Sequence, residues 1–521
     1  MSTLRLKTNQ SNLIANLRHA FNQASMLGEL LQNARRAQAS TIHITVDQDS
    51  LIVTDNGTGI ADLQTLIHIA ESGWDQQLKE RENAFGLGVL STLYFSEILT
   101  VHSCDKQFCA HTSAIIAGEP IEDGIARFYL EGTAIHLDGV KPAQAGQDLP
   151  SWVEQELRRL CEAFPVQVWF NGVEIPRPLV EPGLAWTNTS MGRVRINLSG
   201  SHTQWRCFLQ GLPIGRVPSY SEHQIVLLPD DALAKLPDRQ HLLNESEDHP
   251  RIQAAVNQAY RDALIEKKQA LAAAEFIEHY AHVCLNSSNA DLLNDVPFVL
   301  RGWFRDWSFE PAGYRDYWQR YMAHGIVARE ALEAVGVWQI DADEDDALAA
   351  EVYLQAANAF LFDEPGLDEG HWLKRLVRTV TPDRIQVRTG PSLHRDGNPC
   401  LADCEVELEL VETLHVGLEG EPEYAVQALR KGGTLYLTAD AGDVTRLVSD
   451  YIFDDRYAED REDEDASSIA TFIAVGCSSS PDRVVDALLP DVLRHAAHPK
   501  LAGAVIHLAF DEAGKLQSVS T

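Results

Sequence analysis

Cysteine is scarce in this chain, with 8 residues among 521. Disulfide-stapled folds are short secreted chains with dense cysteines, so this sparse set excludes that class. Cys400 and Cys404, with His394 nearby, come closest to a metal-binding spacing. We interpret this weak pattern as an ordinary loop rather than a metal site.

Long apolar runs are missing as well. No run approaches the roughly 18–20 apolar residues that a bilayer-spanning helix needs. The N-terminal residues MSTLRLKTNQSN also lack the apolar core of a secretory signal. We therefore expect a cytoplasmic protein without membrane association.

Basic residues are outnumbered, with 43 Lys and Arg against 76 Asp and Glu and a formal net charge of −33. Such a charge repels phosphate backbones, so direct nucleic-acid binding would need a local basic patch. The sequence shows no basic run, whereas residues 453–465, FDDRYAEDREDED, are strongly acidic. We expect this run to be a solvated, mobile loop, and the alternative is a docking segment for a basic partner.

The apolar content of 45% over 521 residues is enough for several cores, and typical domain sizes suggest three or four units. Apolar residues recur at helical spacing over 12–37. TIHITV and LIVTD, on either side of a turn at 47–50, predict a hairpin over 41–55. A polar helical segment follows over 61–84. The class predicted for this region is α+β.

Beyond this region the patterns indicate further units. Strand-like pieces fill 190–232, and 249–285 predict one long helix. The aromatic residues of 303–321 favour a helical core or a protein interface over base stacking, because their neighbours are not markedly basic. The C-terminal part mixes strand-like runs with one helical run and carries no motif that we can name; these are CEVELELVE, GTLYLTAD, IATFIAVG, GAVIHLAF and the helical PDRVVDALLPDVLRHAA.

Polar residues interrupt the apolar face of the first predicted helix. Glu29 and Asn33 in ELLQNARRA are four positions apart and therefore share one helix face. Taken alone, this pair would be interpreted as a polar bridge between core elements. DNGTGI, residues 55–60, follows directly from a strand. Its glycines let backbone approach a ligand, and Asp55 presents a carboxylate that can accept a hydrogen bond from an exocyclic amine.

A third motif, FGLGVLS at residues 85–91, places Gly86 and Gly88 before an apolar helical run. Glycines at a helix start expose amide groups that can cradle an anion or a phosphate. A pair of packing glycines is the alternative for this motif alone. Gly132 and Thr133 then precede a later strand. The Glu29 and Asn33 pair, DNGTGI, FGLGVLS and this Gly-Thr pair are each weak evidence alone, but their order along the chain is informative.

In this order the motifs resemble the GHKL superfamily of ATPases, which includes gyrase B subunits, the ninety-kilodalton heat-shock chaperone, histidine kinases and MutL. The resemblance covers residues 10–175 and is closest to the chaperone and MutL. It implies a Bergerat-type ATP-binding α/β sandwich over 1–175, followed by a second, transducer-like α/β unit. We place that unit at 176–248, and the sequence patterns predict a helical region over 249–345 and a mixed α/β C-terminal domain of unknown role over 346–521.

The resemblance also implies roles for single residues. Glu29 would activate the attacking water, Asn33 would hold Mg²⁺, and Asp55 would bind the adenine amine. The other residues predicted to contact ATP are Gly57, Gly59, Ile60, Ser72, Gly86, Leu87, Gly88 and Thr133. In the following unit KLPDRQ, residues 235–240, offers Lys235 or Arg239 as a γ-phosphate sensor, and an ordinary surface turn is the alternative. Arg36 departs from the family pattern, which has an aspartate there, and Glu71 and Asn83 depart from it in the lid region.

The leading hypothesis is a Mg-ATP-binding, slowly hydrolysing conformational clamp that acts on a protein client and forms a homodimer when ATP closes its lid. One alternative is a MutL-like or topoisomerase-like DNA-processing subunit, which salt-dependent retention on DNA would distinguish. Another is a nucleotide-gated regulatory scaffold, for example in a bacterial defence or stress system. The sequence does not choose the client.

Overall fold

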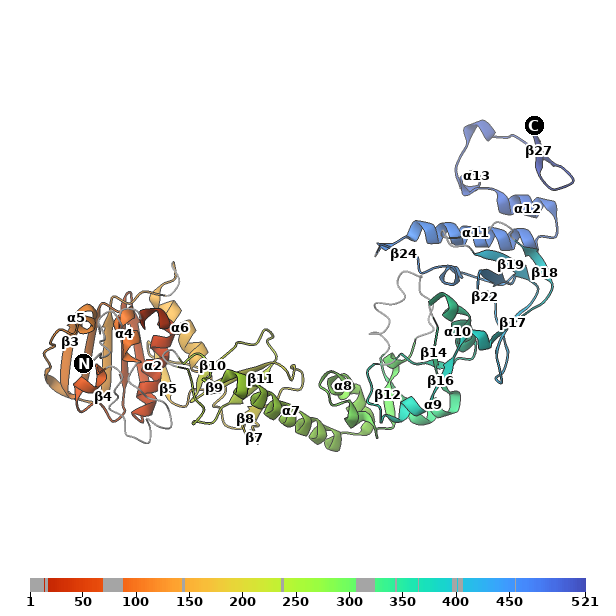
Figure 1. Ribbon diagram of the computed structural model, residues 1–521. Coiled ribbons are helices and arrows are strands. Elements are labelled where there is room, and N and C mark those ends of the chain that lie inside the picture. Colours follow the sequence, from red (N-terminus) through yellow and green to blue (C-terminus); the bar gives the residue numbers. More distant parts are fainter. Residues whose placement is uncertain are drawn as a thin grey trace, which may run out of the picture. The chain divides into compact units, whose positions relative to one another are not determined.

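The computed structural model describes residue 14 and residues 17–68, 88–142, 146–235, 239–305, 324–342, 344–363, 365–395, 401, 406–454 and 456–521. The chain forms two compact units, Met1–Ala270 and Leu271–Thr521, and Figure 1 labels their elements. The predicted α+β class is confirmed. The finer division at residues 175, 248 and 345 stays a prediction.

The first sheet of unit 1 has six strands, with the predicted hairpin at its centre. The hairpin pairs antiparallel from Ile42 opposite Asp55 to Asp47 opposite Ser50, as the alternating pattern predicts. Only the β1–β5 pairing is parallel among the pairings described for this sheet. In spatial order the strands are β3 (Ile98–His111), β4 (Gly124–Asp138), β2 (Ser50–Asp55), β1 (Thr41–Asp47), β5 (Gln167–Phe170) and β6 (Val173–Glu174).

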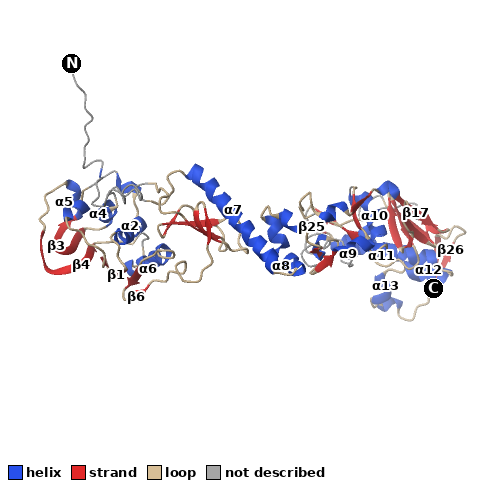
Figure 2. Ribbon diagram, turned by 90° about the horizontal axis from the view of Figure 1, so that it is seen from below, coloured by secondary structure: helices blue, strands red, loops and turns tan. Residues whose placement is uncertain are grey.

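A layer of helices packs on this sheet. Helix α2 (Gln23–Arg36) begins where Asn22 accepts a hydrogen bond from the Ser25 amide and donates its own amide to the Ser25 hydroxyl, which caps the helix reciprocally. Leu27 and Leu31 of α2 are buried in one core with Ile42 and other strand residues. Helices α4 (Val89–Phe95) and α6 (Leu149–Leu160) lie beside α2 (Figure 2), and α5 (Thr112–Ala117) follows β3.

A second sheet of five strands completes unit 1, in the spatial order β10 (Leu212–Ile214), β9 (Trp205–Leu209), β11 (Gln224–Leu227), β8 (Gly192–Arg195) and β7 (Thr187–Thr189). Helix α7 (Glu245–Ala270) covers it, and buried side chains of α7 such as Ile252 and Val256 share a core with Val194 and Val226. The strand-like pieces expected over 190–232 are therefore present as a separate sheet.

The turn between β9 and β10 docks on the first sheet's helix layer. Gln210 and Gly211 both have positive φ, of 54° and 86°, as a tight two-residue hairpin turn requires. A Cβ atom on Gly211 would lie 2.8 Å from the Cα of Phe164 and 2.9 Å from the backbone oxygen of Ala163. Only glycine allows the two main chains to approach this closely.

Unit 2 contains several small sheets, and some of them share one core with residues 348–354 and 469–472. Its helices are α8 (Ala273–Asn286), α9 (Arg329–Val335), α10 (Glu344–Ala356), α11 (Glu459–Cys477), α12 (Pro481–Leu488) and α13 (Asp491–His495). The strands, grouped by sheet, are β12 (Phe298–Leu300) and β13 (Ile326–Ala328); β15 (Phe360–Leu361), β14 (Val337–Ile340) and β16 (Val377–Val380); β17 (Ile385–Thr389), β20 (Leu414–Leu418) and β21 (Tyr424–Ala425); β18 (Ser392–Arg395), β19 (Glu407–Val411), β23 (Thr434–Leu437) and β22 (Ala428–Lys431); β24 (Ile452–Phe453) and β25 (Arg456–Tyr457); β26 (His507–Phe510) and β27 (Leu516–Ser520).

Short 3-10 helices occur in both units, namely η1 (Arg18–Ala20), η2 (Leu63–Leu66), η3 (Ala290–Leu293), η4 (Arg301–Trp303), η7 (Trp372–Arg375), η8 (Pro382–Arg384), η9 (Thr445–Leu447) and η10 (Pro499–Leu501). Within the described ranges, no helix combines the length and apolarity needed to cross a membrane.

Three expectations for the secondary structure were wrong. The single helix expected over 249–285 is two helices, α7 and α8, with a break at Leu271 and Ala272. The run IATFIAVG belongs to α11 and not to a strand. Most of the acidic run is the N-terminal part of α11, where acidic side chains are favoured by the helix dipole. Glu462 is buried there and accepts hydrogen bonds from Thr445 and Tyr457.

Other expectations lie outside the described residues. These include 69–87, which hold most of the lid segment, and Cys400 and Cys404. Most of the aromatic run, residues 306–323, is likewise not described, although Trp303 and Phe304 at its start are buried as a core would require.

Candidate functional site

On the polar face of α2, Glu29 is buried and Asn33 is half-buried, in line with the inward face expected for this pair. Only 7% of Glu29 is exposed. Because carboxylates are rarely buried without partners, this burial indicates that other groups stabilise the Glu29 side chain. Arg36 lies on the same face, two turns after Glu29. The Arg36 Nη1 atom is 3.9 Å from Glu29 Oε2 and donates to Asn33 Oδ1 at 3.4 Å. One helix face thus carries a carboxylate, an amide and a guanidinium close together.

Arg239 reaches Glu29 from the second sheet's side of unit 1. Its Nε atom lies 3.3 Å from Glu29 Oε1, and 13% and 9% of the two side chains are exposed. Arg239 has a φ of 54°, an uncommon backbone conformation for a residue with a side chain. Such strain persists where surrounding contacts hold it, and it clusters at functional sites. Lys235, the other predicted sensor, is exposed, so Arg239 is the one that the fold brings to Glu29.

Gly88 brings the start of α4 against the same carboxylate. A Cβ atom built on Gly88 would overlap Oε2 of Glu29. The last residue of the predicted phosphate cradle therefore lies directly beside the predicted base. Ser72, Gly86 and Leu87 lie outside the described residues.

Asp55 forms the second part of the site, at the end of β2. Its Oδ1 atom accepts a hydrogen bond of 2.8 Å from the Gly57 amide. Burial raises the pKa of the Asp55 carboxyl above its usual value, against the lowering effect of backbone hydrogen bonds from Gly57 and Thr133. Thr133 lies directly opposite Asp55 on β4. The two residues that the resemblance assigns to the adenine contact therefore lie side by side at one strand end.

The loop after Asp55 is tied to the end of α2. The Thr58 amide donates to the backbone oxygen of Ala37 at 2.8 Å, and Asn56 Oδ1 accepts from the Ser40 and Thr41 amides. A Cβ atom on Gly57 would lie 2.6 Å from the Ala37 oxygen, so glycine is needed for this approach. These bonds connect the Asp55 loop to the helix that carries Glu29 and Asn33.

Ser103 is a site residue that the sequence analysis missed. Its hydroxyl accepts from the Ile60 amide at 2.7 Å, lies 3.0 Å from the Thr133 hydroxyl and donates to the Gly132 oxygen at 2.8 Å. A Cβ atom on Gly59 would lie 3.1 Å from this hydroxyl. In the sequence, the one feature that marks Ser103 is its position at the end of the strand-like EILTVHS. Its hydrogen-bond partners depend on the β3–β4 register, which local sequence patterns do not predict.

Gly132 is expected to be indispensable for this arrangement. Its φ is 90°, and a Cβ atom there would overlap the backbone oxygen of Asp55. Replacing Gly132 by alanine should therefore destabilise unit 1 by roughly 1–3 kcal/mol, the typical cost of such backbone strain. Chemical denaturation would measure this. Gly124→Ala is the matched control, because Gly124 is in the same strand and an added Cβ there meets no atom within 4 Å. Equal stability of the two variants would contradict the assigned backbone role.

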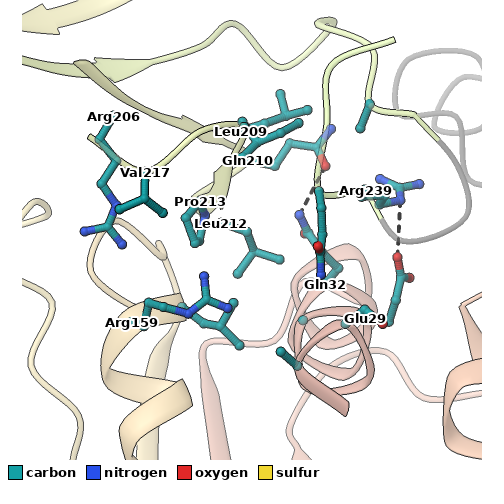
Figure 3. A pocket seen from close by; sticks show the side chains of 18 of the residues that line it. Glu29, Gln32, Arg159, Arg206, Leu209, Gln210, Leu212, Pro213, Val217 and Arg239 are labelled. Carbon is teal, nitrogen blue, oxygen red and sulfur yellow. Dashed lines mark hydrogen bonds and ion pairs between the residues drawn. The ribbon is translucent and has the colours of Figure 1, made fainter. Parts of the chain in front are cut away.

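A cavity of about 230 Å³ opens between α2, α6 and the β9–β10 hairpin (Figure 3). Glu29 and Arg239 line one side of it, and Gln32 of α2 donates to Gln210 of the hairpin turn at 3.2 Å. Two arginines on the other side are already engaged with carboxylates, Arg159 with Glu156 at 2.8 Å and Arg206 with Glu162 at 2.7 Å. None of these cavity residues except Glu29 and Arg239 was predicted.

The residues around Asn33 do not fit a divalent cation as they stand. Mg²⁺ takes oxygen ligands in octahedral geometry and usually one or two carboxylates besides phosphates. Here the Asn33 oxygen already accepts from a guanidinium, and Glu29 faces two of them. No group of three or more His, Cys, Asp or Glu side chains able to hold a metal occurs in the described part of the chain.

Comparison with known families gives one match. Residues 21–117 match the family of histidine kinase-, DNA gyrase B- and HSP90-like ATPases. The matched range includes α2, the β1–β2 hairpin, the Asp55 loop and the start of α4. No curated protein matches the chain.

Proposed function

Since residues 21–117 form an ATPase domain of the GHKL superfamily, which supports ATP binding, we propose that this protein also hydrolyses ATP slowly and acts as a nucleotide-operated clamp. The observation that carries the proposal is the buried ion pair between Glu29 of α2 and Arg239, which follows the second sheet. The predicted base and a cation from another part of unit 1 meet at one point. A change at the nucleotide can therefore reach the second sheet directly.

ATP would engage the site through three sets of groups. Asp55 would accept a hydrogen bond from the adenine amine, with Thr133 and Ser103 holding the strand ends in place. Backbone amides near Gly88 would contact the phosphates. Glu29 would orient or deprotonate the attacking water, and the cavity beside it gives room for water next to polar partners.

Arg239 would couple the nucleotide to the second sheet. A γ-phosphate near Glu29 competes with the carboxylate for the Arg239 guanidinium, because both are anionic acceptors. Transfer of Arg239 to the phosphate would leave Glu29 free to act on water. ATP would then favour one arrangement of the β9–β10 hairpin and Arg239 over the other, and only such a difference in affinity shifts a conformational equilibrium.

Arg239→Gln is expected to lower ATP turnover by about tenfold or more, because a charged hydrogen bond to the phosphate is lost. Lys235→Gln is the matched control, since Lys235 is exposed, and turnover should stay at the wild-type level. Hydrogen exchange gives a second measurement. A non-hydrolysable ATP analogue should protect residues 239–243 in the wild type and not in Arg239→Gln, whereas ADP should protect mainly the Asp55 loop. Equal protection by both nucleotides would contradict a clamp and favour a passive nucleotide-binding scaffold.

The client and the oligomeric state complete the proposal. The net charge of −33 favours a protein client over nucleic acid. We expect a homodimer that forms with the ATP analogue and dissociates with ADP, which light scattering after gel filtration would detect. The expectation that Asn33 holds Mg²⁺ is not carried into this proposal, because Arg36 occupies its oxygen.

A further inference from the structure

The guanidinium of Arg36 lies at the point where the predicted metal ligand and the predicted base meet. It follows Asn33 by three residues and Glu29 by seven, so all three side chains leave the same face of α2. Nη1 is 3.4 Å from Asn33 Oδ1 and 3.9 Å from Glu29 Oε2. Only 3% of the Arg36 side chain is exposed. A permanent positive charge is therefore built into the interior of the site.

This charge opposes a divalent cation at Asn33. Like charges a few ångströms apart repel each other strongly where water is excluded. A cation bound to the Asn33 oxygen would also displace the Arg36 hydrogen bond and leave the guanidinium buried without that acceptor, which is costly. Moving Arg36 out of the helix face would in turn remove one of the two cations that balance Glu29.

The Arg36 guanidinium can supply the positive charge and the hydrogen-bond donors that bind a nucleotide's phosphates. A guanidinium keeps its charge at all relevant pH values, and its planar donors match phosphate oxygens. Gly88, at the end of the predicted phosphate cradle, packs against Glu29 and so lies on the same side of α2 as Arg36. Arg36 and Arg239 together carry two positive charges beside one carboxylate. Both guanidinium groups can donate hydrogen bonds to an anionic ligand at this point.

We propose that Arg36 takes the place of the divalent cation in nucleotide binding, so that this chain binds ATP without Mg²⁺. The inference rests on the proposed ATP binding and specifies its ionic requirement. It assigns to Arg36 a role in ligand specificity, since the bound species would be the free nucleotide polyanion and not its metal complex.

The test is calorimetric titration of the full chain with ATP, once in excess MgCl₂ and once in excess EDTA at equal ionic strength. The two dissociation constants of the wild type should agree within about threefold, a difference of less than one hydrogen bond to a charged group. An affinity that falls by more than about tenfold in EDTA would overturn the inference. Absence of ATP binding in both buffers would instead refute the proposed function itself.

Variants then show whether Arg36 is responsible. Arg36→Gln should weaken ATP binding in EDTA by about tenfold or more, and Arg36→Lys, which keeps the charge, should restore most of it. Arg35→Gln is the matched control, because Arg35 is the neighbouring arginine and bonds to Gln32 instead. Wild-type affinity of Arg36→Gln in EDTA would overturn the role of Arg36. Thermal unfolding checks that each variant folds. If Arg36→Gln does not fold, the titrations of the wild type in MgCl₂ and in EDTA still decide whether ATP binding requires Mg²⁺.

Discussion

Replacing Glu29 by glutamine is expected to lower ATP turnover by about 10²–10⁴-fold, which is the usual contribution of a positioned general base. ATP affinity should stay within a few fold of the wild type, because the proposed role of Glu29 is to act on the attacking water and not to bind the nucleotide. Glutamine is preferred to alanine for this test. It keeps an oxygen that can accept from the guanidinium groups of Arg36 and Arg239, which would otherwise lose this acceptor.

Single-turnover hydrolysis and calorimetric binding, measured on the same preparation, separate the two effects. Glu154→Gln is the matched control, since Glu154 pairs with Arg158 on the exposed side of α6 and touches nothing at the site. Its turnover should equal that of the wild type. Unchanged single-turnover hydrolysis in Glu29→Gln would mean that Glu29 has a structural role only, as a partner for the two arginines.

Asp55→Asn is expected to weaken ATP binding by roughly 5–150-fold, which corresponds to about 1–3 kcal/mol for an unsatisfied buried polar group. The asparagine can still accept from the Gly57 amide through its oxygen, so the fold of the loop should persist. Its amide group, however, would meet the adenine amine donor to donor. Asp47→Asn at the far end of the same hairpin is the control. An affinity of Asp55→Asn equal to the wild type would reject the adenine assignment.

The pH dependence of binding tests the same assignment independently. Burial raises the pKa of the Asp55 carboxyl, so the ionised form that accepts from adenine is present above this raised pKa and is lost as the pH falls through it. ATP affinity of the wild type should therefore decline at a higher pH than an exposed aspartate would allow. Asp55→Asn should lack this component. Titrations of both proteins over the acidic range isolate it as a difference.

Local patterns were sufficient to predict the centre of unit 1. The alternation in TIHITV and LIVTD sets which residues of the hairpin face the core, and the observed pairing of Ile42 with Asp55 follows from the short turn between the strands. The helical spacing around Glu29 and Asn33 likewise predicts a shared inward face, which burial confirms for Glu29. These features depend on residues within about one hairpin or helix of each other, where geometry follows directly from period.

Contacts between distant segments could not be predicted in the same way. The sequence offered Lys235 and Arg239 equally, and only the packing of the second sheet against α2 places Arg239 at Glu29. The partners of Ser103 depend on strand register in the same manner. The break after α7 has no glycine or proline to signal it, because Leu271 and Ala272 are good helix formers. The acidic run was misjudged because its charge suggested solvent, whereas hydroxyl groups satisfy Glu462 inside unit 2.

The docking of the β9–β10 turn has a consequence for how this protein can change during evolution. A Cβ atom at position 211 would lie 2.6 Å from Pro165 Cδ, 2.8 Å from Phe164 Cα and 2.9 Å from the Ala163 oxygen, so the hairpin reaches this segment after α6 only because position 211 has no side chain. Any side chain at position 211 would act as a spacer between the hairpin and residues 163–165. Under the proposed coupling, we expect natural variation at this one position to separate the second sheet from the nucleotide site without changing a residue of that site.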